Sequence, residues 1–65
     1  MLNEKETLNL LKGALKNYVK CLERNDFDYM EYKGHIIAYI NILDREDLKG
    51  RYLDINRAKE LLNKI

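Results

Sequence analysis

The sequence predicts an all-α protein: an antiparallel helical hairpin followed by a short C-terminal helix. Three observations predict it. Apolar residues recur at helical steps of three and four, the chain has no proline, and one short polar stretch separates the two longest apolar patterns. The 65 residues form a single domain, 1–65, near the length at which one core barely offsets chain entropy. We therefore expect contacts with a second copy or another protein to complete the fold.

The first helix is predicted over residues 3–24. Asn3 or Glu4 opens it, and the acidic residues of its first turn suit the positive end of the helix dipole. Gly13 lies in the middle at a cost of about 1 kcal/mol relative to alanine, which a closely approaching backbone would explain. The buried stripe is predicted to contain Leu8, Leu11, Leu15, Tyr18 and Leu22.

The second helix is predicted over residues 28–46, after the turn-forming stretch "ERNDFD". Asp28, three residues before Glu31, has the spacing of a helix cap, and Phe27 is placed to pack on the first turn. Because the connection between the two long helices is short, we expect them to be antiparallel neighbours.

The third helix is predicted over residues 54–64, after the polar stretch "DREDLKGRYLD". Asp54 is the expected cap. The apolar residues of this helix are Ile55, Ala58, Leu61, Leu62 and Ile65.

The second helix carries more large apolar groups than one packing face needs. A broad face contains Tyr29, Tyr32, Ile36, Tyr39, Ile40 and Leu43, while Met30, Ile37 and Ile42 lie on other sides. One side packs on the first helix, which leaves the remainder for the third helix, a second subunit or another protein. Because the short third helix can shield only part of it, we expect some of these groups to contact another chain. The predicted protein interface consists of Tyr29, Tyr32, Ile36, Ile37, Tyr39 and Ile40.

Three lysines form a ridge along the first helix. Lys12, Lys16 and Lys20 are the only charges between Thr7 and Leu22, and their i, i+4, i+8 spacing places them in one row. This lysine ridge could bind an anionic partner, either nucleic acid or an acidic protein surface. The favoured alternative is a solvated face opposed by acids of the other helices.

The sequence offers little for catalysis or for a cofactor. Cys21 and His35 are the single cysteine and histidine, so a nucleophile and base would have to be this pair, with no third group in view. We favour an apolar, buried role for Cys21 and a surface or interface position for His35. No metal site, cofactor or small-molecule substrate is predicted.

Composition excludes other classes. The net charge of +1 gives no overall attraction to nucleic acid or membranes. No apolar run approaches membrane-spanning length, and the start "MLNEKETLNLLKG" lacks the apolar core of a signal peptide. We expect a cytoplasmic protein without a membrane segment.

An amphipathic helix, the acidic turn "NDFDYMEY" and the helix "HIIAYINIL" occur in this order. The arrangement resembles the short helical-hairpin proteins encoded among virion-structure genes of tailed bacteriophages. The likeness covers about residues 5–46, and Ala38 and Ile42 stand where that family usually has glycine. The resemblance implies an accessory protein bound to other phage proteins, in the host cytoplasm or the virion. The residues that carry it are Glu31, Tyr32, Ala38, Ile40 and Leu43.

The predicted function is therefore non-enzymatic protein binding through the apolar and aromatic side of the second helix. The alternative is a small regulator that binds an enzyme or nucleic acid through the lysine ridge.

Overall fold

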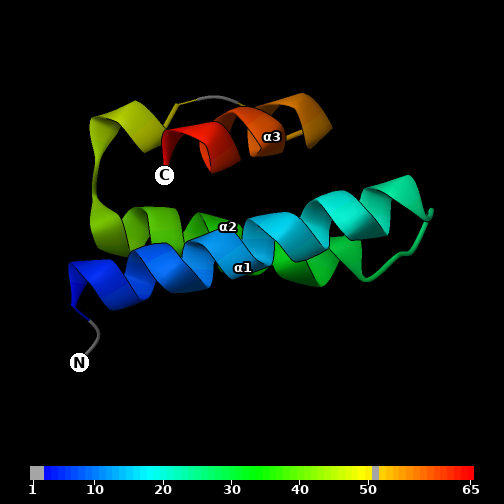
Figure 1. Ribbon diagram of the computed structural model, residues 1–65, viewed down its shortest axis with the longest axis horizontal. Helices are drawn as coiled ribbons and strands as arrows, with labels where there is room; N and C mark the ends of the chain where they lie inside the picture. Colours follow the sequence, from blue (N-terminus) through cyan, green and yellow to red (C-terminus); the bar gives the residue numbers. More distant parts are fainter. Residues whose placement is uncertain (1–2, 51) are drawn as a thin grey trace.

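A computed structural model describes residues 3–50 and 52–65 of the protein. These residues form the helices α1 (Glu4–Glu23), α2 (Tyr29–Leu43) and α3 (Ile55–Lys64), with a 3₁₀ turn, η1 (Glu46–Leu48), between α2 and α3. α1 and α2 pack as an antiparallel hairpin, and α3 packs on α1 (Figure 1). The all-α fold predicted from the sequence is confirmed.

The first helix begins and ends close to the predicted residues. Asn3 is its N-cap: the Asn3 side-chain oxygen accepts a hydrogen bond from the backbone N–H of Glu6 at 2.8 Å, and its amide donates to the Glu6 carboxylate at 2.9 Å. The first of these bonds satisfies a backbone N–H of the first turn that has no partner within the helix. Arg24 is the C-cap, so both ends of the predicted range are cap residues.

The turn between α1 and α2 differs from the prediction. Asp28 precedes α2, but its backbone is already α-helical, whereas a side-chain cap needs an extended backbone. The side chain of Asp26 accepts the Asp28 N–H at 3.0 Å instead. Phe27 is 84% exposed and does not cover the first turn. The predicted Asp28 cap and Phe27 packing are therefore wrong.

The second helix ends at Leu43, three residues before the predicted end. Asp44 adopts a left-handed conformation, with φ 53°, which stops the helix. The chain then turns back through η1, whose Leu48 is 3% exposed and joins the core. Burial of Leu48 requires the chain to leave the helical path, so tertiary packing decides this boundary.

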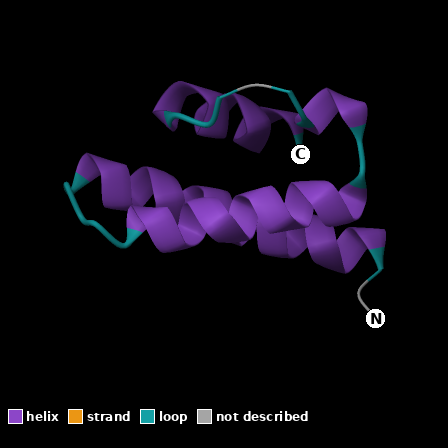
Figure 2. Ribbon diagram, turned by 180° about the vertical axis from the view of Figure 1, so that it is seen from behind, coloured by secondary structure: helices purple, strands orange, loops and turns teal. Residues whose placement is uncertain are grey.

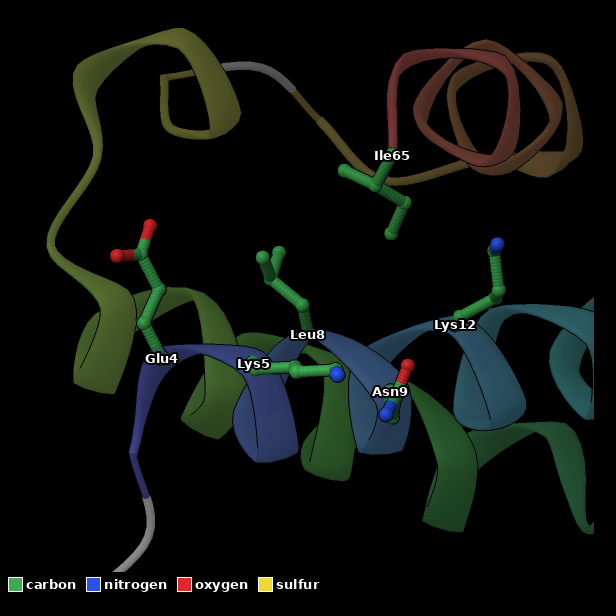
Figure 3. Close-up of a pocket in the computed structure, with 6 residues that line it drawn as sticks. All are labelled: Glu4, Lys5, Leu8, Asn9, Lys12 and Ile65. Atoms are coloured by element: carbon green, nitrogen blue, oxygen red, sulfur yellow. The ribbon is translucent and has the colours of Figure 1, made fainter.

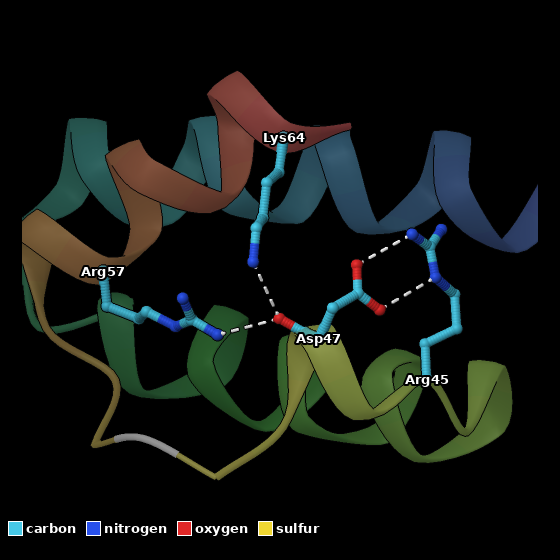
Figure 4. Close-up of polar contacts among 4 residues, drawn as sticks. All are labelled: Arg45, Asp47, Arg57 and Lys64. Atoms are coloured by element: carbon cyan, nitrogen blue, oxygen red, sulfur yellow. Dashed lines mark hydrogen bonds and ion pairs between the residues drawn. The ribbon is translucent and has the colours of Figure 1, made fainter.

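α3 begins toward the end of the hairpin that holds the turn between α1 and α2, and it runs antiparallel to α1 (Figure 1). Asp54 caps α3, as predicted, by accepting the backbone N–H of Arg57 at 2.8 Å. The Arg57 guanidinium is nearly buried and donates to the Glu60 carboxylate and to the backbone carbonyl of Asp47. Lys64 donates to the same carbonyl at 3.1 Å (Figure 4). These bonds hold α3 against η1.

The core lies where the three helices meet the chain that leads from η1 to α3, residues 46–50 and 52–54, which we call the returning segment. Within it the Tyr18 hydroxyl donates a hydrogen bond to the backbone carbonyl of Leu53 at 3.3 Å. This bond satisfies the polar end of an otherwise buried ring. The buried cluster consists of Leu11, Ala14, Leu15, Tyr18, Ile36, Leu48, Leu53, Ala58 and Leu61.

Gly13 does not have the close neighbour that we expected. Its position on α1 is exposed, and a Cβ built there would meet no atom of the described chain within 4 Å. Packing among the described residues therefore gives no reason for a glycine at this position.

Candidate functional site

α2 buries only one of its side chains fully, among the residues that the structure describes. Ile36 is 0% exposed and lies in the core, so its predicted place at an interface with another chain is wrong. It sits at the centre of the broad apolar face, which α1 and the returning segment cover. The apolar surplus of α2 must therefore lie on its other sides.

The other predicted interface residues remain at least partly accessible. Ile37 is 46% exposed, and the other four are half-buried against the core. Each can contact solvent or a second molecule without unfolding. Their assignment to an interface stays a prediction for Tyr29, Tyr32, Ile37, Tyr39 and Ile40.

An aromatic row lies along one flank of α2. The His35 ring stands between Tyr32 and Tyr39, with ring centroids 6.3 and 6.4 Å apart. Together with Gly13 and Asn17 of α1, these rings line a shallow hollow of about 270 Å³. The surface position predicted for His35 is confirmed.

The opposite flank of α2 faces the segment that returns from η1. Ile37 and Ile40 line a hollow of about 270 Å³ whose other wall includes Leu48 and Leu53. Farther along, the Lys33 ammonium lies 4.9 Å from the centre of the Tyr52 ring, a cation–π distance. This flank is thus partly covered by the chain itself.

A row on the outer side of α2 was missing from the predicted site. Met30 is 66% exposed and Ile42 is 60% exposed, and the small residues Gly34 and Ala38 lie between them at steps of four. We call these four residues the outer row of α2. Figure 2 shows the molecule from behind, with α3 above the hairpin of α1 and α2. The signal was available, because Met30 and Ile42 fall outside the broad apolar face.

The lysine ridge is exposed along its whole length. None of the ion pairs within residues 3–50 and 52–65 includes Lys12, Lys16 or Lys20. The ridge is solvated, as the favoured explanation expects, but no described acid of α2 or α3 lies at ion-pair distance from it. Its charge is therefore left to solvent or to a partner.

A further hollow, of about 340 Å³, lies between the start of α1 and the end of α3. Leu8 and Ile65 face each other across it, with Glu4, Lys5 and Lys12 around them (Figure 3). The hollow is a small apolar surface, formed by Leu8 and Ile65, with charged side chains around it.

The structure does not bring Cys21 and His35 together. Cys21 is buried, as predicted, while His35 is exposed beside the aromatic rings of α2. No hydrogen bond involves either side chain within the described part of the chain. Over the same residues, no three His, Cys, Asp or Glu side chains lie close enough to hold a metal ion.

Comparisons with family models, curated proteins and solved structures found no match to this chain. Over residues 3–50 and 52–65, no helix has both the length and the apolar content that crossing a membrane requires.

Proposed function

We propose that this protein is a non-enzymatic protein-binding module that docks through the exposed side of α2. The observation that supports this is exposure: Met30, Ile37 and Ile42 keep 66%, 46% and 60% of their surface accessible on one 15-residue helix. Single exposed apolar residues are ordinary, but several on one helix are typical of a surface that another protein covers.

The binding mechanism in this proposal is burial of a helix face. Complete burial of a large apolar side chain contributes about 1.5–3 kcal/mol relative to full exposure. Met30, Ile37 and Ile42 begin roughly half to two-thirds exposed, so each can supply about half of that amount or more on docking. The half-buried tyrosines add contact area, and their hydroxyls can form hydrogen bonds at the rim.

We place this module among small structural or accessory proteins of a tailed bacteriophage, in the host cytoplasm or the assembled virion. The support is the resemblance carried by "NDFDYMEY" and "HIIAYINIL" together with the hairpin formed by α1 and α2. A protein of this kind would act by occupying a site on a larger phage protein.

The test is a pull-down from the native source with tagged wild-type protein, Ile37→Asp and, as a matched surface control, Lys16→Gln. We expect Ile37→Asp to weaken capture of a partner about thirtyfold, the effect of losing an anchor worth about 2 kcal/mol. Lys16→Gln should change it little. A wild-type protein that captures nothing and stays monomeric would contradict the proposal.

The second candidate function is a regulator that binds nucleic acid or an acidic enzyme surface through the lysine ridge. The specific observation in its favour is that no described acid pairs with these lysines. If all three contact phosphates of duplex DNA, the logarithm of the binding constant should fall with the logarithm of salt concentration with a slope of about −2.7. Replacing the three lysines by Gln should abolish such binding.

A further inference from the structure

We propose that the partner of α2 is a second copy of this chain, bound antiparallel across the outer row. This inference rests on the proposed function, since it takes α2 as the docking surface and names what docks there. It starts from the exposed apolar residues Met30 and Ile42, which the described chain leaves uncovered at the two ends of the row.

The order of sizes along the outer row reads the same in both directions. Met30, Gly34, Ala38 and Ile42 are large, small, small and large, and steps of four residues place them about 6 Å apart along the helix axis. All four are exposed, and a Cβ built at Gly34 would meet nothing within 4 Å in the described chain. The centre of the row is therefore open for another backbone.

A two-fold axis through the midpoint of the row makes it complementary to itself. Each Gly34 then faces Ala38 of the second copy, and each Met30 faces Ile42 of the second copy. When two helices cross at about −50°, the commonest helix-packing class, their rows with steps of four run parallel to each other. Small residues at the crossing let the axes approach closely, and the large residues fill the space on either side. A dimer interface of this kind needs one patch that is its own complement.

Charge also favours a second copy. A two-fold axis brings residues near it close to their own copies, so a charged residue there would be repelled by its counterpart. From Gly34 to Leu43 the sequence has no Asp, Glu, Lys or Arg. The exposed Glu31 lies beside Met30 at one end of the row, and in the antiparallel arrangement it meets the uncharged Asn41 of the second copy. By contrast, the outer side of α1 carries the lysine ridge. The uncharged centre of the row fits an equally uncharged surface, which a second copy provides.

The expected dimer is weak and reversible. A standard interface removes about 800 Å² from each partner, roughly a sixth of the 4618 Å² surface of this chain. A single helix crossing covers less than that, so association must be measured at high protein concentration.

The test is sedimentation equilibrium of the full chain up to millimolar concentration, on wild type, Gly34→Leu and Gly13→Leu. Both glycines lie mid-helix, are exposed and have no described neighbour within 4 Å of an added Cβ, so the two substitutions are matched within the monomer. Both should improve helix propensity, which circular dichroism checks. We expect the wild type and Gly13→Leu to dimerise alike. Gly34→Leu, which blocks the crossing, should weaken association at least about tenfold.

The outcomes separate this inference from the proposed function. Ala38→Glu, which places like charges near the axis, should weaken the dimer as Gly34→Leu does. Equal effects of the two glycine substitutions would overturn the inference, because association would then use another surface. A wild type that is monomeric at millimolar concentration would also overturn it. If that monomer still loses a captured partner on Ile37→Asp, the proposed function stands. If it captures nothing, both fail.

Discussion

Ile36 and Ile37 are adjacent isoleucines in α2 whose substitution should have very different consequences. Ile36 is 0% exposed in the core, whereas Ile37 is 46% exposed. Replacing either by valine removes one methylene and changes helix propensity in the same way, because both residues are branched at Cβ. The comparison therefore isolates the effect of burial.

The burial of Ile36 sets the size of the effect. Removing a buried methylene costs the lost transfer free energy plus a term for the small cavity, together about 0.5–1.5 kcal/mol for isoleucine to valine. In a domain of this size about 1 kcal/mol lowers the melting temperature by roughly 4–8 °C. Ile37→Val should change the free energy of unfolding by less than about 0.5 kcal/mol, as for other surface substitutions.

Thermal and urea unfolding, followed by circular dichroism at low protein concentration, would measure both values. Low concentration matters because association through α2 would add stability that depends on concentration. Equal shifts for the two variants, or a larger shift for Ile37→Val, would refute the assignment of Ile36 to the core and Ile37 to the surface.

Three further predictions concern the surface. Gly13→Ala should raise the free energy of unfolding by about 0.8–1 kcal/mol, because alanine has the higher helix propensity and the added Cβ meets nothing in the described chain. A lower urea midpoint would indicate that another group lies close to position 13. Replacing the three lysines of the ridge by Gln should leave the circular dichroism spectrum unchanged. It should raise the melting temperature slightly, since it removes repulsion of about 0.2–0.5 kcal/mol per pair. A marked drop in melting temperature would contradict a purely surface role for these lysines. A hydrogen bond from Lys49 holds the pKa of Asp44 below its ordinary value, and one from Arg45 does the same for Asp47. A carboxyl group whose pKa is lowered in the folded state stabilises that state at pH values above the ordinary pKa of about 3.9. This stabilisation is lost as the pH falls below that value and through the lowered pKa. Asp44→Asn with Asp47→Asn should therefore flatten the loss of stability below about pH 4, and an unchanged acid limb in urea titrations would count against both pairs.

Local sequence signals predicted the parts of the fold that depend on nearby residues. Asn3 and Asp54 cap their helices because each side chain reaches a backbone N–H three residues on, a contact that needs no other element. The regular spacing of leucines along α1 placed Leu11 and Leu15 in the core, where both are 0% exposed.

The errors occur where distant segments compete with local signals. Asp28 has the spacing of a cap, but the turn at Asp26 puts its backbone in a helical conformation. The helical pattern runs past Leu43, yet the chain leaves the helix at Asp44 and buries Leu48. A local pattern cannot show that a residue five positions farther on will be needed in the core.

The candidate site shows the same division. The sequence by itself determined that α2 has more apolar side chains than one face can bury, because composition and periodicity are properties of the helix alone. Only the tertiary structure decided which of them remain outside: α1 and the segment returning through η1 cover Ile36, while the outer row from Met30 to Ile42 stays exposed. The physical reason is that burial depends on where neighbouring elements lie around the helix axis, and their positions are set by contacts between segments far apart in the chain.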